Sequence, residues 1–255
     1  MSTKKTQSRF PTEIVDLPSK GLLYPEGHPL KEGKVEVKYM TAKEEDILTS
    51  MNLIEKGVVI DELLKSLIIT KFNYGDLLIG DKNAIMLSAR ILGYGKEYKV
   101  EVTCGSCGEK EDTPFDLTGY PYKEVDESQF NSDNSFKFSL PNSEREVEFK
   151  LLTHADEQAI TQELDRMQKA GMQATGEITT RLRYQLLSVD GNTDKEFINN
   201  FINNEFFAMD SRAFREHVVQ ITPDVDFTSY FLCDACGASD EIQLPITTNF
   251  FWPSR

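Results

Sequence analysis

The four cysteines of this 255-residue chain are the residues whose type and spacing point most directly to chemistry. They form two motifs of one pattern, Cys104-Gly-Ser-Cys107-Gly and Cys233-Asp-Ala-Cys236-Gly. A Cys-x-x-Cys turn directs two sulfurs at one metal ion, and the glycine that follows permits a backbone conformation that a side chain would strain. Two turns fill a tetrahedral shell and leave no position for water or substrate. We therefore expect a structural zinc ion held by Cys104, Cys107, Cys233 and Cys236.

Other uses of the four thiols stay open at this point. The same residues would serve as a redox pair, as intramolecular disulfides or as unligated cysteines. Neither motif opens a predicted helix whose dipole would lower a thiol pKa, which disfavours redox chemistry. A reducing compartment disfavours disulfides. The sequence thus favours the shared zinc site over these alternatives.

No catalytic constellation accompanies the cysteines in the sequence. There is no Gly-x-x-x-x-Gly-Lys-Ser/Thr loop for phosphates, and the three histidines, His28, His154 and His217, lack the spacing of a His-Glu-x-x-His zinc enzyme. We interpret each histidine as an ordinary surface or packed residue. The prediction is a non-enzymatic protein without a small-molecule substrate. The alternative is a zinc-dependent or thiol-redox enzyme with an unrecognised site.

Predicted β-hairpins position both cysteine motifs. Alternating apolar residues over Glu97–Thr103 form a strand that leads into Cys104, and Asp226–Leu232 forms a strand that leads into Cys233. Between Cys107 and Cys233 lie 125 residues, so one shared metal would make most of that stretch an insertion. Because loop-closure entropy grows only logarithmically with length, an insertion with its own core adds little cost.

Helical patterns surround the hairpins. A strand over Lys34–Met40 precedes a capping box, Thr41 to Glu44, which starts a helix that Gly57 stops. Phe136 to Leu140 and Val147 to Leu151 predict a second strand pair. Further helices are predicted from Asp61 to Ile69, from Asp81 to Leu92, from Thr153, and over 177–189, 194–202 and 210–220, with a loop at 170–176.

These elements predict an α+β fold. Its zinc-ribbon-like β hairpins come together from distant parts of the chain, with an N-terminal helical region and a mainly helical insertion. We divide the chain into four segments: a flexible tail and extended proline-rich arm (1–33), a strand, helices and the first zinc knuckle hairpin (34–119), a connection, strand pair and helical insertion (120–225), and the second zinc knuckle hairpin with an aromatic C-terminal tail (226–255).

The two ends of the chain carry apolar residues that must be buried somewhere. Four prolines between Phe10 and Leu30 exclude a helix and predict an extended arm, while Phe250, Phe251 and Trp252 crowd the other end. Each end could dock on its own domain or on a partner subunit. We expect removal of residues 250–255 to weaken association with partners more than it disturbs the fold.

Charge narrows the class of partner. The chain has 28 basic and 42 acidic residues, for a formal net charge of -14, which repels nucleic acid and anionic lipid. Met1–Arg9 is polar and is not followed by the apolar core of a secretion signal, and no stretch approaches the roughly 18 apolar residues of a membrane span. A soluble protein made in the cytosol is expected.

Five motifs in this order resemble the baseplate hub family of contractile-tailed bacteriophages related to T4. They are Leu17-Pro-Ser-Lys-Gly-Leu-Leu-Tyr-Pro25, Met40-Thr-Ala-Lys-Glu-Glu-Asp-Ile-Leu48, Asp76-Leu-Leu-Ile-Gly-Asp-Lys-Asn-Ala-Ile85, Tyr94-Gly-Lys-Glu-Tyr98 and Phe250-Phe-Trp-Pro253. The resemblance implies a non-enzymatic virion or assembly protein of the tail baseplate that contacts other hub and tail proteins and is assembled in the host cytoplasm. It implies no catalytic residues.

Overall fold

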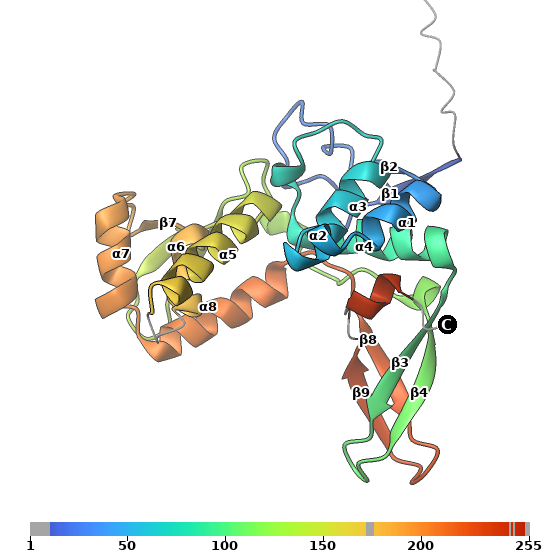
Figure 1. The fold of residues 1–255 in the computed structure, drawn as a ribbon. Coiled ribbons are helices and arrows are strands. Elements are labelled where there is room, and N and C mark those ends of the chain that lie inside the picture. Colours follow the sequence, from blue (N-terminus) through green and yellow to red (C-terminus); the bar gives the residue numbers. More distant parts are fainter. Residues whose placement is uncertain (1–10, 172–175, 245, 247, 253–255) are drawn as a thin grey trace, which may run out of the picture.

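A computed structural model describes residues 11–171, 176–244, 246 and 248–252. Within these residues the chain forms eight α-helices and nine strands in small antiparallel sheets, which confirms the predicted mixture of helices and sheets. Figure 1 shows three parts, which we call the body (residues 11–95), the helical lobe (127–221) and the projection (97–116 and 228–243). The predicted tail Met1–Arg9 lies outside the described residues, and the division into four segments stays a prediction.

The body combines one strand pair with four helices. Strand β1 (Thr12–Asp16) pairs antiparallel with β2 (Lys34–Lys38), followed by α1 (Ala42–Leu48), α2 (Met51–Glu55), α3 (Val59–Leu67) and, after a short 3-10 turn η1 (Tyr74–Asp76), α4 (Ile79–Tyr94). The single helix predicted between Thr41 and Gly57 is wrong, because α1 ends before Thr49 and α2 begins after Ser50. Hydroxyl side chains at both positions compete for backbone hydrogen bonds and favour such breaks.

The proline-rich arm lies on its own body. The amide and hydroxyl of Ser19 donate to the Asp81 carboxylate at 2.9 and 2.7 Å, and the Tyr24 hydroxyl donates to it at 2.7 Å. Leu23 and Tyr24 are both buried. Asp81 therefore anchors the arm from inside α4, whose first residue is Ile79. The prediction that Asp81 caps this helix is wrong for that reason.

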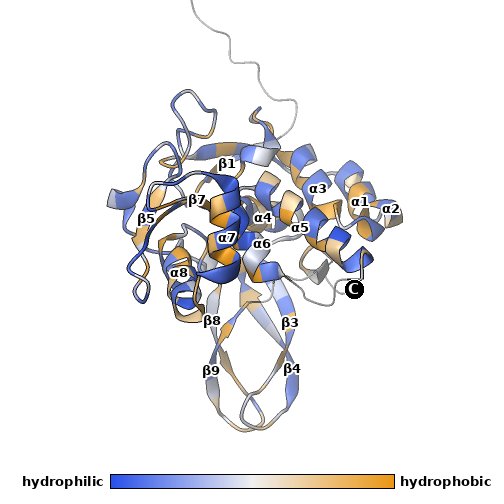
Figure 2. Ribbon diagram, turned by 90° about the vertical axis from the view of Figure 1, so that its left-hand side faces the viewer, coloured by the Kyte–Doolittle hydropathy of each residue, from blue (hydrophilic) through white to orange (hydrophobic). Residues whose placement is uncertain are grey.

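Two hairpins build the projection, as predicted. Helix α4 gives way at Gly95 to β3 (Glu97–Thr103), which pairs with β4 (Lys110–Asp116), while β8 (Thr228–Leu232) pairs with β9 (Ser239–Gln243). Figure 2 shows the two hairpins on opposite sides of the projection below the rest of the molecule. Their inward side chains alternate with outward ones, so Val102, Phe115 and Phe231 are buried.

The aromatic end of the chain closes the base of the projection. Short 3-10 helices η2 (Leu117–Gly119) and η4 (Thr248–Phe251) lie there, and Phe250 and Phe251 are 0% and 1% exposed. The Phe250 ring meets the edge of Tyr98 with centroids 5.0 Å apart, and the Arg90 guanidinium donates through Nε to the Phe250 carbonyl at 2.7 Å. Both apolar ends thus dock on their own chain.

The helical lobe wraps a three-stranded sheet. The sheet order is β5 (Phe136–Ser139), β6 (Glu146–Phe149) and β7 (Leu186–Val189), and the helices are η3 (Glu127–Gln129), α5 (His154–Lys169), α6 (Glu177–Gln185), α7 (Lys195–Asn204) and α8 (Ala208–Ile221). The helix predicted over 177–189 is wrong after Gln185, because Leu186–Val189 pairs with β6. A short apolar run fits either element by its pattern alone. Of the predicted loop 170–176, residues 172–175 lie outside the described part.

A short stem joins the lobe to the rest of the molecule. It consists of two extended segments, residues 121–123 and 224–226, that form an isolated antiparallel bridge. The Lys123 amide donates to the Asp224 carbonyl at 2.9 Å, and the Asp226 amide donates to the Pro121 carbonyl at 2.8 Å. Beside the stem, a Cβ added to Gly80 would lie 1.8 Å from the Pro223 carbonyl oxygen, so only glycine allows α4 to approach this closely. No helix in the described residues is both long and apolar enough to cross a membrane.

Candidate metal centre

The two cysteine turns lie at the far end of the projection (Figure 1). Single sulfur atoms from Cys104, Cys107, Cys233 and Cys236 all lie within 4.8 Å of one another. The sulfurs of Cys104 and Cys236 are 3.7 Å apart, as are those of Cys107 and Cys233. A tetrahedral ion with zinc–sulfur bonds of about 2.3 Å needs sulfurs about 3.8 Å apart. The distances therefore fit a four-thiolate metal site, and the predicted meeting of the two motifs is confirmed.

Both turns share one backbone arrangement. The Cys104 amide donates to the Glu109 carbonyl and the Gly108 amide to the Cys104 carbonyl, at 2.8 and 2.9 Å. The second turn repeats the pattern with Cys233, Ala238 and Gly237 at 2.9 and 2.8 Å. Gly108 and Gly237 have φ values of 78° and 71°, in the left-handed region that favours glycine. The glycine after each second cysteine thus lets the turn close over its sulfurs.

Backbone hydrogen bonds lower the pKa values of the thiols, whereas neighbouring thiols can raise them. Backbone amides of Cys107 and Ser106 donate to the Cys104 sulfur and lower the pKa of Cys104 to about 7. The Glu109 amide lowers the pKa of Cys107, but the neighbouring Cys236 and Cys104 thiols outweigh it and raise that pKa to about 12. Four thiols so close together cannot all ionise without a cation between them. This is the electrostatic character of a metal-binding site.

Burial divides the cysteines into two pairs. Cys104 and Cys233, which directly follow strands β3 and β8, are buried, whereas Cys107 and Cys236 are exposed at the tip. The Asp234 amide donates to the Glu111 carboxylate at 3.2 Å, a contact that joins one turn to the other hairpin. The cluster thus takes one buried and one exposed cysteine from each hairpin.

Comparison with known families gives the chain its assignment. A model of the family described as T4 bacteriophage base plate protein matches residues 13–252. The chain belongs to this family. No curated protein and no solved structure matches it. Family membership supports a structural role in the tail base plate of a T4-like phage, among other base plate proteins, and agrees with the resemblance carried by the five motifs.

The histidines of this base plate protein lie away from the cysteines and pack against aromatic rings. Burial lowers the pKa of both His154 and His217. The ring partners are Tyr24 for His28, Tyr74 for His154 and Phe138 for His217, with centroids 4.9, 4.6 and 4.4 Å apart. Their interpretation as packed residues is confirmed.

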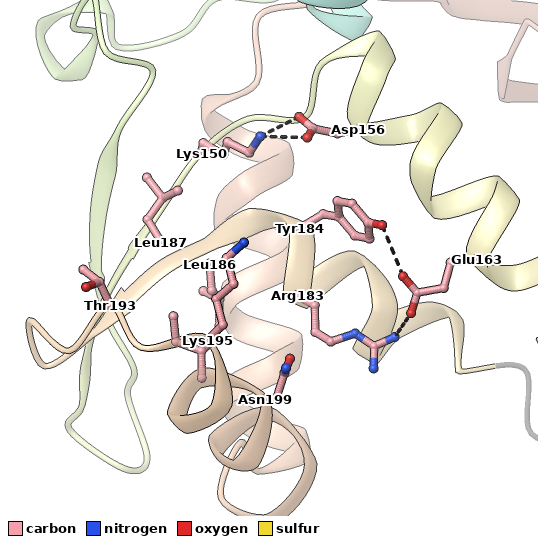
Figure 3. Close-up of a pocket in the computed structure, with 11 residues that line it drawn as sticks. Lys150, Asp156, Glu163, Arg183, Tyr184, Leu186, Leu187, Thr193, Lys195 and Asn199 are labelled. Carbon is pink, nitrogen blue, oxygen red and sulfur yellow. Dashed lines mark hydrogen bonds and ion pairs between the residues drawn. The ribbon is translucent and has the colours of Figure 1, made fainter.

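The helical lobe has a pocket of about 620 Å³ with a mixed polar and apolar lining (Figure 3). Four of its charged groups form two ion pairs: Lys150 donates to Asp156 at 2.7 and 2.8 Å, and the Glu163 carboxylate accepts from Arg183 at 2.5 Å and from Tyr184 at 3.2 Å. These pairs connect α5 to the strand before it and to α6. We interpret the pocket as a structural junction of the base plate protein.

Two buried groups of the base plate protein were not recognised from the sequence. Arg90 is 1% exposed and donates to the carbonyls of Phe250, Gly95 and Glu97. Asp81 was taken for a helix cap, although the motif around it belongs to the family resemblance. Nothing in local sequence identifies partners 160 residues away. The one sequence signal that could identify Arg90 is its place among the apolar residues of a predicted helix.

Proposed function

We propose that this chain is a non-enzymatic structural or assembly component of the base plate hub that binds other hub and tail proteins. Cys104, Cys107, Cys233 and Cys236 would be the ligands of one structural zinc ion. The meeting of four sulfurs at the tip of the projection, in a chain of the base plate family, carries this proposal. Assembly in the host cytoplasm and a lack of nucleic-acid, membrane or small-molecule partners belong to the same proposal.

Zinc fits this donor set better than other common metals. Thiolates are soft ligands that suit zinc and iron–sulfur centres, whereas carboxylate and carbonyl oxygens suit magnesium and calcium. A zinc ion with a complete thiolate shell supplies structural free energy rather than an open site for chemistry. The cysteine turns would then clamp two hairpins that are separated in the sequence by the whole helical lobe.

Metal content tests the zinc assignment. Full-length protein purified without chelators should contain one zinc ion per chain, as measured by inductively coupled plasma mass spectrometry. Its thiols should react with a thiol reagent only after the metal is removed. Iron in place of zinc, or freely reactive thiols with no metal, would contradict the assignment.

Cross-linking within the particle tests the hub role separately. Base plates and hub intermediates isolated from infected cells would be cross-linked and digested, and cross-linked peptides identified by mass spectrometry. Cross-links to proteins of the central hub are expected. Cross-links confined to peripheral base plate proteins would contradict a hub role while leaving base plate membership intact.

A thiol-redox enzyme is the second candidate. It is favoured by one observation, the pKa of about 7 for Cys104, which places part of this thiol in its reactive form near neutral pH. Catalysed transfer of two electrons from dithiothreitol to glutathione disulfide, faster than the uncatalysed exchange and lost on Cys104→Ser, would support it. A single zinc ion with unreactive thiols would exclude this candidate.

A further inference from the structure

The outward faces of the two hairpins differ at equivalent positions. Counted back from the first cysteine of each turn, Leu232 corresponds to Thr103 and Tyr230 to Glu101. Tyr230 is 74% exposed and Leu232 is 64% exposed, on the same face of β8. The first hairpin has the same turn and also alternates buried and exposed side chains, but its exposed residues are polar. The hairpin fold therefore does not require the apolar side chains of Tyr230 and Leu232.

Strand β8 also has a free edge. The Cys233 amide donates to the Ala238 carbonyl at one end of the hairpin, and the Leu244 amide donates to the Phe227 carbonyl at the other. Because bonded pairs alternate in an antiparallel ladder, the backbone groups of Tyr230 and Leu232 point away from β9. In the described part of the chain β8 pairs with no strand except β9. Its second edge therefore offers amides and carbonyls for pairing.

The first hairpin protects its corresponding edges, but β8 does not. Lys99 on β3 and Lys110 and Pro114 on β4 occupy edge-facing positions, and lysine and proline at such positions prevent the addition of a further strand. The β8 sequence, Thr228-Ser-Tyr-Phe-Leu232, contains neither charge nor proline. The first hairpin is thus built to avoid strand pairing, whereas the β8 edge of the second hairpin is open to it.

Charge around the free edge determines the kind of partner. Asp226 and Asp234 flank β8, and Asp240 and Glu241 lie on β9, while residues 224–254 contain no lysine or arginine. From the other segment of the stem, Lys123 interacts with Asp226, so the acidic character is strongest at the Asp234 end. A second copy paired antiparallel about Tyr230 would place Asp226 opposite Asp234, and like charges that face each other across strands are destabilising. A strand with basic residues at its ends complements this edge.

We infer that the free edge of β8 pairs with an extended segment of another base plate protein. The segment would carry lysine or arginine at both ends and alternating apolar residues between them. Main-chain hydrogen bonds would supply affinity, and Tyr230 and Leu232 would contact every second side chain of the added strand. This inference rests on the proposed binding of other base plate proteins and names the surface and the chemistry of that partner.

Labelled peptides test the inference on full-length protein by fluorescence anisotropy. The probe is a capped nine-residue peptide, the length from Asp226 to Asp234, with lysine at both ends and alternating threonine and valine between them. One comparison peptide has glutamate ends, and another has proline in place of each valine and cannot form a ladder. The proteins are wild type, the double variant Tyr230→Thr with Leu232→Thr, and Glu101→Thr. The last is the matched control, because position 103 of the first hairpin is already threonine.

The lysine-ended peptide should bind wild type and Glu101→Thr equally and the double variant at least about tenfold more weakly. Both comparison peptides should bind wild type at least about tenfold more weakly than the lysine-ended peptide does. Equal binding to all three proteins, or no binding to wild type, would overturn the inference. A wild-type dimer in sedimentation that the double variant abolishes would assign the edge to a second copy and overturn the basic partner. Missing hub cross-links with peptide binding retained would count against the proposed function alone.

Discussion

At the scale of single residues, the cysteines give the sharpest test of the proposed centre. Cys233→Ser would leave three sulfur ligands and lower the metal affinity, which is part of the free energy of folding. We expect loss of bound zinc and a decrease of about 3 kcal/mol in the free energy of unfolding, or roughly 6 to 12 °C in Tm. Metal analysis and thermal unfolding would measure both.

Ser106→Ala is the matched control for Cys233→Ser, because Ser106 lies in a cysteine turn but offers only its backbone amide to Cys104. This variant should retain one zinc and the wild-type Tm. Full zinc retention with unchanged stability in Cys233→Ser would instead show that this cysteine is not a ligand.

Titration of Glu44 should make the free energy of unfolding depend on pH. Burial raises its pKa, but hydrogen bonds from Lys38, Thr41 and Ser66 outweigh burial and lower the pKa from 4.5 to about 2. A lowered carboxyl pKa stabilises the fold above the unfolded-state pKa, and this stabilisation is lost as pH falls toward the folded-state value. We expect the difference in unfolding free energy between wild type and Glu44→Gln to shrink by about 2 kcal/mol as the pH falls from about 6 to about 3. Urea titrations at several pH values would measure it, and a difference independent of pH would contradict it.

The residues that the sequence could identify were those with a local signature. Two cysteines at fixed spacing before a glycine carry their chemistry in five positions, and a threonine three residues before a carboxylate marks a helix start, as at Thr153 and Asp156. Asp81 and Arg90 have no such signature. Asp81 bonds Ser19, 62 residues away, and Arg90 bonds Phe250, 160 residues away, so these contacts depend on the tertiary fold.

At the scale of elements, strands that alternate were predictable and short apolar runs were not. β3 was predicted because its apolar residues alternate with polar ones, and β8 was predicted from its aromatic residues before Cys233. β7 was taken for the end of a helix, because its four residues are nearly all buried and show no period of two. That these residues form a strand depends on their pairing with β6, a tertiary contact that the local sequence does not reveal.

The burial of the aromatic end predicts that its rings contribute to the stability of the fold, whereas the expected effect of removing residues 250–255 on partner binding stays a prediction. Phe250 is fully buried against Tyr98, and Phe251 meets it edge-on with centroids 5.2 Å apart. Phe250→Ala would leave a cavity between the projection and α4, so we expect a loss of about 3 to 5 kcal/mol in the free energy of unfolding. Tyr230→Ala, which removes an exposed ring, should change it by less than about 0.5 kcal/mol. Denaturant titration of both variants would decide, and equal small effects would mean that the end is not held by its own chain.

At the scale of the whole molecule, the helical lobe is closed at two levels. The cysteine centre joins the hairpins at the tip of the projection, and the stem joins residues 121–123 to 224–226 near the body. Sequence spacing predicted the first closure but gave no sign of the second, which consists of backbone hydrogen bonds between ordinary residues. The stem holds the two ends of the lobe side by side without any metal. The metal therefore does not have to close a long flexible loop, which explains why an insertion this long is compatible with one four-sulfur site.

Removal of the metal should therefore affect one part of the molecule. We expect a chelator to increase amide hydrogen exchange in residues 97–116 and 228–243, because the hairpins would lose their link at the tip, while α5 and α8 keep their protection. Hydrogen-exchange mass spectrometry of the full chain, before and after chelation, measures each region separately. Cys233→Ser is the control, since chelator should add no further exchange to a variant that has already lost its metal. Exchange that rose throughout α5–α8 would mean that the stem does not close the lobe independently and that the metal holds the entire insertion in place.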